Sequence, residues 1–139
     1  MAQNLYEMLK QEHRDVQELF RLVVDQRESA LFPEIEKKLC LHMESEEQFL
    51  YPPLEEVDRV TILEGYEEHK IAKRLIKEIL TESESVDKWF AKTKVLKEII
   101  DHHIKDEERN IFDVAQKTLD EVQEAKIMFQ FKEAGSKLK

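Results

Sequence analysis

Four long stretches of this sequence carry apolar residues three or four positions apart, the spacing that places them on one face of an α-helix. In the first stretch the apolar residues are Leu5, Leu9, Val16, Phe20 and Val23. The chain has only 2 glycines and 3 prolines, too few turn-forming residues for a fold of many short strands. The pattern therefore predicts an all-α protein.

The breaks between these stretches are short and carry signals that start or stop helices. Pro33 suits the first turn of the second helix, because proline has no N–H group to leave unpaired there. Pro52 and Pro53 end that helix. We expect the third helix at about 58–80 and the fourth to begin near residue 85.

The C-terminal part of the chain predicts one more helix. Thr118 followed by Glu121 has the form of a capping box, which places a short helix between this point and Gly135. Short links make consecutive helices antiparallel neighbours. The sequence therefore predicts an up-down-up-down antiparallel four-helix bundle with a short C-terminal fifth helix, as a single domain over residues 1–139.

The charge of the chain narrows the range of partners. Asp and Glu number 31 against 22 Lys and Arg, and the net charge of −9 repels phosphate backbones and anionic lipid surfaces. No apolar run approaches the roughly 20 residues needed to cross a bilayer. The single cysteine, Cys40, cannot form an internal disulfide, and the first residues lack the pattern of a signal peptide. We expect a cytoplasmic protein, a monomer or weak homodimer, that binds neither nucleic acid nor membranes.

Histidines and glutamates interrupt each apolar face where a core is expected. Each of the four helices has at least one inward imidazole, and the second and fourth add a carboxylate one turn later, on the same face. These six inward donors are His13, His42, Glu46, His69, His103 and Glu107.

The second and fourth helices repeat each other around these donors. HMESEEQFLYP at 42–52 aligns without gaps with HIKDEERNIFD at 103–113, and both read His-x-x-x-Glu-Glu, two residues, then an apolar-aromatic pair. A single pair of His and Glu four residues apart occurs by chance in Glu-rich helices, and a lone inward histidine is usually a hydrogen-bonded core residue. Two buried carboxylates without a cation, however, cost several kcal/mol each, and no Lys or Arg shares the apolar face with Glu46 or Glu107. The joint pattern predicts a metal site.

The donor types restrict the metal. Four imidazoles and two carboxylates lack the thiolates typical of structural zinc sites and have too many nitrogens for calcium or magnesium. The mixed set favours iron, with manganese or zinc as substitutes. Six donors either saturate one ion or serve two ions, and two fit better because a glutamate from each of two helices can bridge them.

These motifs resemble a known family. HMESEEQFLYP and HHIKDEERNIF, with one histidine on each of the first and third helices, are similar to hemerythrin-like, or HHE cation-binding, domains from His13 to about Asp113. The resemblance implies an up-down four-helix bundle with two iron ions in a non-haem di-iron centre, oxo- or hydroxo-bridged. Carried over position by position, it implies His13 and His42 for one iron, His69 and His103 for the other, and Glu46 and Glu107 as bridges.

The sequence departs from the oxygen-carrying members of that family at two points. The carriers have His-x-x-x-His on the third helix, whereas HKIAK places Lys73 where the second histidine would be. They also take the last bridging carboxylate five residues after the histidine, which selects Glu108, whereas the internal repeat selects Glu107, which we prefer. The four-histidine pattern is closer to HHE domains of iron sensing, iron handling and nitrosative-stress repair.

Other residues lie near the six donors along the chain. Glu12, Glu47 and Glu108 are candidate hydrogen-bond partners for imidazole N–H groups. Tyr66 is a candidate additional ligand, and Lys73 is expected to reach solvent.

The sequence thus predicts that the protein binds or senses a small diatomic molecule, O2 or NO, or handles iron at a carboxylate-bridged di-iron centre, rather than being a dedicated enzyme. The alternative is a non-catalytic interaction or regulatory bundle with structural or zinc-binding histidines. A histidine-phosphotransfer bundle needs an exposed histidine near a lysine and a glycine, and EEHKIAKRL has no glycine.

Overall fold

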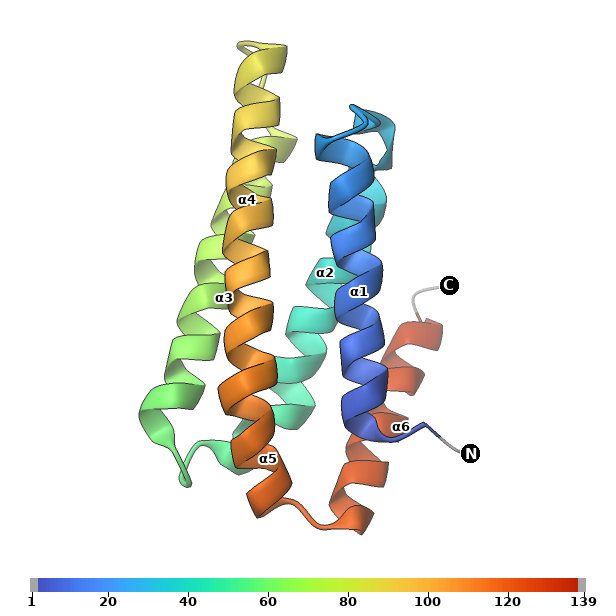
Figure 1. Cartoon of the computed structure of the whole chain (residues 1–139), viewed down its shortest axis with the longest axis vertical. Coiled ribbons are helices and arrows are strands. Elements are labelled where there is room, and N and C mark those ends of the chain that lie inside the picture. Colours follow the sequence, from blue (N-terminus) through green and yellow to red (C-terminus); the bar gives the residue numbers. More distant parts are fainter. Residues whose placement is uncertain (1–2, 138–139) are drawn as a thin grey trace.

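The computed structural model describes residues 3–137 as four long antiparallel helices with a fifth helix on one side (Figure 1). α1 packs against α2 and α4, and α3 packs against α4 and α2. The predicted fold class is confirmed. The long helices are α1 (Leu5–Val24), α2 (Phe32–Ser45), α3 (Arg59–Leu80) and α4 (Val86–Asp106).

Side-chain caps set where three of these helices begin. Asn4 and Glu7 form a reciprocal capping box at the start of α1. The side chains of Asp58 and Ser85 accept backbone N–H groups in the first turns of α3 and α4. Each cap satisfies donors that a helix N-terminus leaves unpaired, which explains why α3 and α4 begin near the expected positions.

π-helical turns continue the second and fourth helices, over Glu46–Leu50 and Glu107–Ile111. In the first, the Tyr51 N–H donates to the Glu46 carbonyl oxygen, five positions earlier, at 2.8 Å. In the second, Phe112 and Glu107 are paired in the same way. Residues five apart lie on different sides of a regular α-helix, but a π turn stacks them, so both Glu46 and Tyr51 face the interior. The sequence analysis assumed regular helices and missed these turns.

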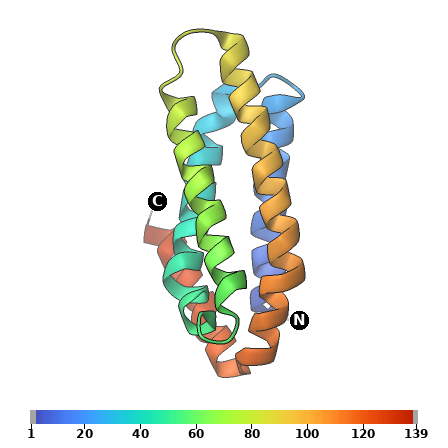
Figure 2. The same cartoon turned by 90° about the vertical axis from the view of Figure 1, so that its left-hand side faces the viewer.

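The predicted C-terminal helix is confirmed as α6, but its capping residues and its C-terminal end differ from those expected. α5 (Phe112–Thr118) extends the fourth helix, and α6 (Glu121–Lys137) then runs back along α1 and α2 (Figures 1 and 2). The capping box before α6 is formed by Asp120 and Gln123, because Thr118 still belongs to α5. α6 also continues through Gly135, which does not have a positive φ and so does not end the helix.

The core consists of two apolar clusters with a polar layer between them. On α1, Leu9 belongs to one cluster, Val16 belongs to the other, and the buried His13 lies between them. The layer therefore crosses the bundle at the level of His13. Among the described residues, no helix combines the length and the apolar character needed to span a membrane.

Gly65 on α3 lies against the ring of Tyr51. A Cβ at this position would lie 3.0 Å from Tyr51 Cε2 and 3.2 Å from Ile111 Cδ1. The Tyr51 ring cannot easily move, because it stacks on His69 and meets the edge of Tyr66. We expect Gly65→Ala to lower the free energy of unfolding by about 1–3 kcal/mol, despite a helix-propensity gain of about 1 kcal/mol. Denaturant unfolding measures this change.

Gly135 supplies the matched control. Among residues 3–137, a Cβ there would meet only Leu41 Cδ2, at 3.9 Å, so Gly135→Ala should leave stability unchanged or raise it by up to about 1 kcal/mol. Equal stabilisation by the two substitutions would contradict the tight packing at Gly65.

Candidate metal centre

The six inward donors converge in the polar layer, where these residues are between 0 and 6% exposed. Their ligand atoms form two groups, and within each group all of these atoms lie within 4.8 Å of one another. The two glutamates belong to both groups. Position A comprises His13, His42, Glu46 and Glu107, and position B comprises Glu46, His69, His103 and Glu107.

At position A the imidazole Nε2 atoms of His13 and His42 are 3.1 Å apart. Glu107 Oε1 lies 3.0 Å from His13 Nε2, and Glu46 Oε2 lies 3.1 Å from His42 Nε2. Two ligand atoms at right angles, each about 2.1 Å from a metal ion, are separated by about 3 Å. These spacings therefore match those of neighbouring ligands on one cation.

Position B has the same arrangement. The Nε2 atoms of His69 and His103 are 3.1 Å apart, Glu46 Oε1 is 3.1 Å from His69 Nε2, and Glu107 Oε2 is 3.3 Å from His103 Nε2. Each glutamate thus turns one oxygen toward A and the other toward B. This is the orientation that two bridging carboxylates need.

Each imidazole is fixed from its other side by a second glutamate, through a contact of 2.6–2.7 Å to Nδ1. A proton on Nδ1 leaves the Nε2 lone pair free to face the centre.

Three of these contacts, made by Glu12, Glu47 and Glu108, were expected, and that of Glu68 was missed. The dipeptide Glu-His occurs at 12–13 and again at 68–69, so extending the internal repeat would have found it. The pairs are His13 with Glu108, His42 with Glu12, His69 with Glu47 and His103 with Glu68.

Removing one of these outer carboxylates should weaken metal binding. We expect Glu68→Ala to lower the affinity about 10–100-fold, because His103 loses the partner that sets its orientation and tautomer. A cobalt(II) titration against a competing chelator measures the change. Glu67→Ala is the control, since Glu67 is 64% exposed and pairs with Lys70 on the surface. Equal losses in the two variants would argue against a specific role for Glu68.

The structure places Glu107, not Glu108, at the centre. Glu107 is fully buried, whereas Glu108 lies outside, where it contacts His13 Nδ1 and pairs with Arg14 at 2.6 Å. This placement favours the carboxylate selected by the internal repeat. Its assignment as a ligand stays a prediction.

Three other residues near the donors lie outside the two groups. The Tyr66 hydroxyl is 3.5 Å from the carbonyl oxygen of Glu47, and Lys73 Nζ is 3.1 Å from a carboxylate oxygen of the same residue. Lys73 therefore helps to fix the outer partner of His69. His102 is 68% exposed and pairs with Asp106 at 3.1 Å.

Tyr51 is a central residue that the sequence analysis did not single out. Its buried hydroxyl donates to Glu107 Oε2 at 2.5 Å and lies 3.4 Å from Glu46 Oε1 and from His69 Nε2. It reaches this place because the π turn stacks it over Glu46. The sequence signal that could have indicated Tyr51 is the apolar-aromatic pair near the end of each copy of the repeat.

The electrostatics of the centre fit a cation. Burial by itself would lower the pKa of the four imidazoles, but their contacts with Glu46 and Glu107 raise it. Burial would raise the pKa of the two carboxyls, but the surrounding imidazoles lower it. Even so, Glu46 Oε2 is buried without a hydrogen-bond partner among the described residues. A cation at position A would satisfy this oxygen. The arrangement therefore fits the metal ion that the mixture of imidazoles and carboxylates implies.

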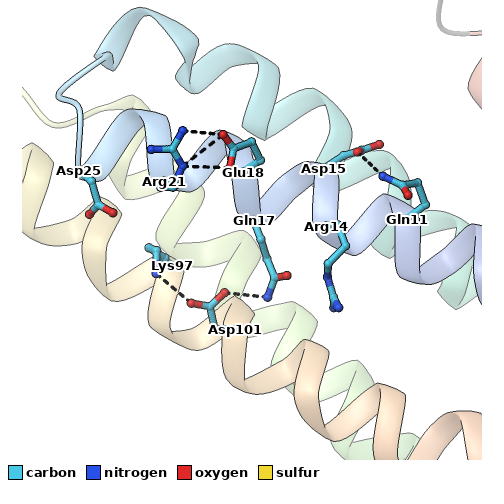
Figure 3. A pocket seen from close by; sticks show the side chains of 9 residues that line it. All are labelled: Gln11, Arg14, Asp15, Gln17, Glu18, Arg21, Asp25, Lys97 and Asp101. Carbon is cyan, nitrogen blue, oxygen red and sulfur yellow. Dashed lines mark hydrogen bonds and ion pairs between the residues drawn. The ribbon is translucent and has the colours of Figure 1, made fainter.

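A broad surface groove of about 730 Å³ between α1 and α4 is a weaker candidate (Figure 3). Four of its charged side chains pair with one another, Arg21 with Glu18 and Lys97 with Asp101. Exposed charges that neutralise each other offer little to a ligand. The groove therefore receives no functional assignment.

The fold and the buried donor set together define the class of protein. The sequence matches the family model described as hemerythrin HHE cation binding domain over residues 4–115. The match covers most of the chain, so this chain belongs to the hemerythrin HHE cation-binding family, and the predicted resemblance is confirmed.

Similarity to individual proteins extends over nearly the whole chain. A crystal structure of a hemerythrin HHE cation binding domain-containing protein from Mycobacterium kansasii shares the fold, with a TM-score of 0.81, 22% identity and coverage of 99% of this chain and 91% of that one. A curated protein of Nostoc sp. named DNA nickase is 28% identical over 97% of this chain. The chain spans only 40% of the length of that protein.

Proposed function

We propose that this protein binds two iron ions, at positions A and B, and that the pair binds a small diatomic molecule, O2 or NO. The observation that carries the proposal is the sharing of two buried carboxylates. Glu46 and Glu107 each turn one oxygen to either position, and two imidazoles complete each group. Mixed nitrogen and oxygen donors suit iron, with manganese or zinc as substitutes.

Bound iron would supply open coordination positions and electrons for O2 or NO. The chain itself supplies orientation and a dry environment. The outer glutamates fix the imidazoles, and the two apolar clusters exclude water from both sides of the layer. A cavity of about 10 Å³ adjoins His13 and His42 and is otherwise lined largely by apolar side chains such as Val16, Leu39 and Ile100. Its volume is near the minimum for one water molecule, so the larger O2 or NO would need these side chains to move apart to enter.

We do not extend the activity named for the Nostoc relative to this chain. The alignment covers less than half of that protein, and the net charge of −9 opposes binding to a phosphate backbone. We therefore propose that this chain acts without nucleic acid.

Metal analysis and optical spectroscopy of the purified protein test the proposal. We expect about two irons per chain and a near-ultraviolet charge-transfer band that changes on reduction. Adding NO to the reduced protein under anaerobic conditions should then change the visible spectrum. Protein that contains only zinc, or that has no metal and melts at the same temperature with and without chelator, would instead support a structural or regulatory bundle.

A further inference from the structure

The two halves of the centre repeat each other contact for contact. α1 and α2 supply one half, and α3 and α4 supply the other. Glu12, the residue before His13, contacts Nδ1 of His42. In the same way Glu68, the residue before His69, contacts Nδ1 of His103. The corresponding residues are His13 and His69, His42 and His103, Glu46 and Glu107, Glu12 and Glu68, and Glu47 and Glu108.

One pair of residues breaks this repeat. Tyr51 and Phe112 each follow a π turn, and each ring stacks on a histidine of the centre. Tyr51 lies 5.4 Å from His69 at 20°, and Phe112 lies 6.0 Å from His13 at 14°, measured between ring centroids and planes. Only Tyr51 has a hydroxyl group, and it donates to Glu107 Oε2.

The missing second hydroxyl explains the unpaired oxygen. Glu107 Oε2 faces His103, four residues earlier, at 3.3 Å, and Glu46 Oε2 faces His42, also four residues earlier, at 3.1 Å. These two oxygens therefore correspond to each other. Glu107 Oε2 is paired with a hydroxyl, whereas Glu46 Oε2 is the buried oxygen without a hydrogen bond. Because Phe112 corresponds to Tyr51 in the repeat, we expect a hydroxyl on its ring to be directed toward Glu46 Oε2.

We infer that the Tyr51–Phe112 pair makes positions A and B unequal in their affinity for cations. Tyr51 acts as a positioning residue, because its hydroxyl fixes Glu107 Oε2, the oxygen that faces position B. The hydrogen bond also partly neutralises the negative charge of that oxygen. On the side of A, Glu46 Oε2 has no hydroxyl partner in the described part of the chain, and the Nε2 atom that faces it, that of His42 at 3.1 Å, would itself turn to the cation. The inference rests on the proposed function, since it requires cations at both positions.

Cobalt(II) titration of the metal-free full chain tests the inference, with Tyr51→Phe and Phe112→Tyr as matched variants. Each substitution gives the two halves the same number of hydroxyls at this position, none in Tyr51→Phe and two in Phe112→Tyr, while the other differences between the halves stay as they are. Neighbouring cations repel each other, so even a centre with two equal positions has two different stepwise binding constants. The ratio of these constants in the variants is the baseline for the wild type. A hydrogen bond to a charged group predicts that the ratio of the two constants in the wild type exceeds the baseline about tenfold or more.

Proton NMR of chains loaded with one cobalt each supplies a readout that a purely structural role for Tyr51 would not move. The exchangeable imidazole N–H signals shifted by cobalt should come mainly from one histidine pair in the wild type. In both variants they should come from both pairs. If Phe112→Tyr does not fold, Tyr51→Phe alone must lower the ratio.

The outcomes separate the inference from the proposed function. A ratio that stays unchanged in either folded variant, or signals from both pairs in the half-loaded wild type, overturns the inference and leaves the two-cation site intact. Failure of the wild type to take up cobalt overturns both.

Discussion

We expect Glu107→Gln to reduce the metal content of the chain from the two ions proposed to one or none. Glu107 is fully buried and turns Oε1 to His13 at 3.0 Å and Oε2 to His103 at 3.3 Å, so it serves both positions. Glutamine keeps the shape but loses the charge, and it must point an amide N–H2 group at one of the two cations. Breaking a buried ion pair costs about 3–5 kcal/mol, which corresponds to an affinity loss of at least about a hundredfold.

Metal analysis after desalting and a cobalt(II) isotherm measure this loss. Glu36→Gln is the control, because Glu36 lies on α2 outside both donor groups and should leave two ions bound. Circular dichroism of the metal-free variant checks that the bundle still forms. Two tightly bound ions in folded Glu107→Gln protein would refute the bridging role.

The fold and the burial of the six candidate donors were predictable from the sequence because both follow from helical periodicity, while their roles as ligands stay predictions. His42 and Glu46 fall on one face of a regular helix, and the gapless repeat points to Glu107 rather than Glu108. Tyr51 was missed because a regular helix turns it away from Glu46. Only the wider π turn brings both inward, and such a turn depends on tertiary packing rather than on local spacing.

The C-terminal end of α6 was mispredicted for a similar reason. Gly135 was read as a stop signal, but a glycine ends a helix only where the chain adopts a positive φ, and this one does not. Packing of α6 along α1 and α2 maintains the helix through that residue. Local signals therefore identified the helix, while its last turn was decided by contacts that the sequence does not display.

The second large effect is a reversal of the pH dependence of stability on metal binding. The pKa of the four central imidazoles is raised in the folded metal-free protein, where burial is outweighed by contacts with Glu46 and Glu107. A raised pKa stabilises the fold fully below the unfolded value of about 6.5 and less as pH rises through the folded value. The lowered carboxyl pKa values act at the other end, where stability falls as pH drops below about 4.5. Metal-free protein should therefore be most stable between these limits and lose stability from about pH 6.5 toward pH 9.

Metal replaces the protons that this stability depends on. Cations bind the same Nε2 atoms only when these are deprotonated, so protons compete less as pH rises and the loaded protein gains stability relative to the metal-free form. Free metal at a thousandfold excess over the dissociation constant should add about 4 kcal/mol for each occupied position. Denaturant unfolding at pH 5.5, 7 and 9, with chelator or with metal, measures both curves. His102→Gln, at an exposed histidine, should leave them unchanged, whereas His69→Gln should flatten the metal-free curve and lower the metal-dependent gain. Metal-free protein whose stability rises between pH 6.5 and 9 would show that the imidazolium–carboxylate pairs do not stabilise the polar layer.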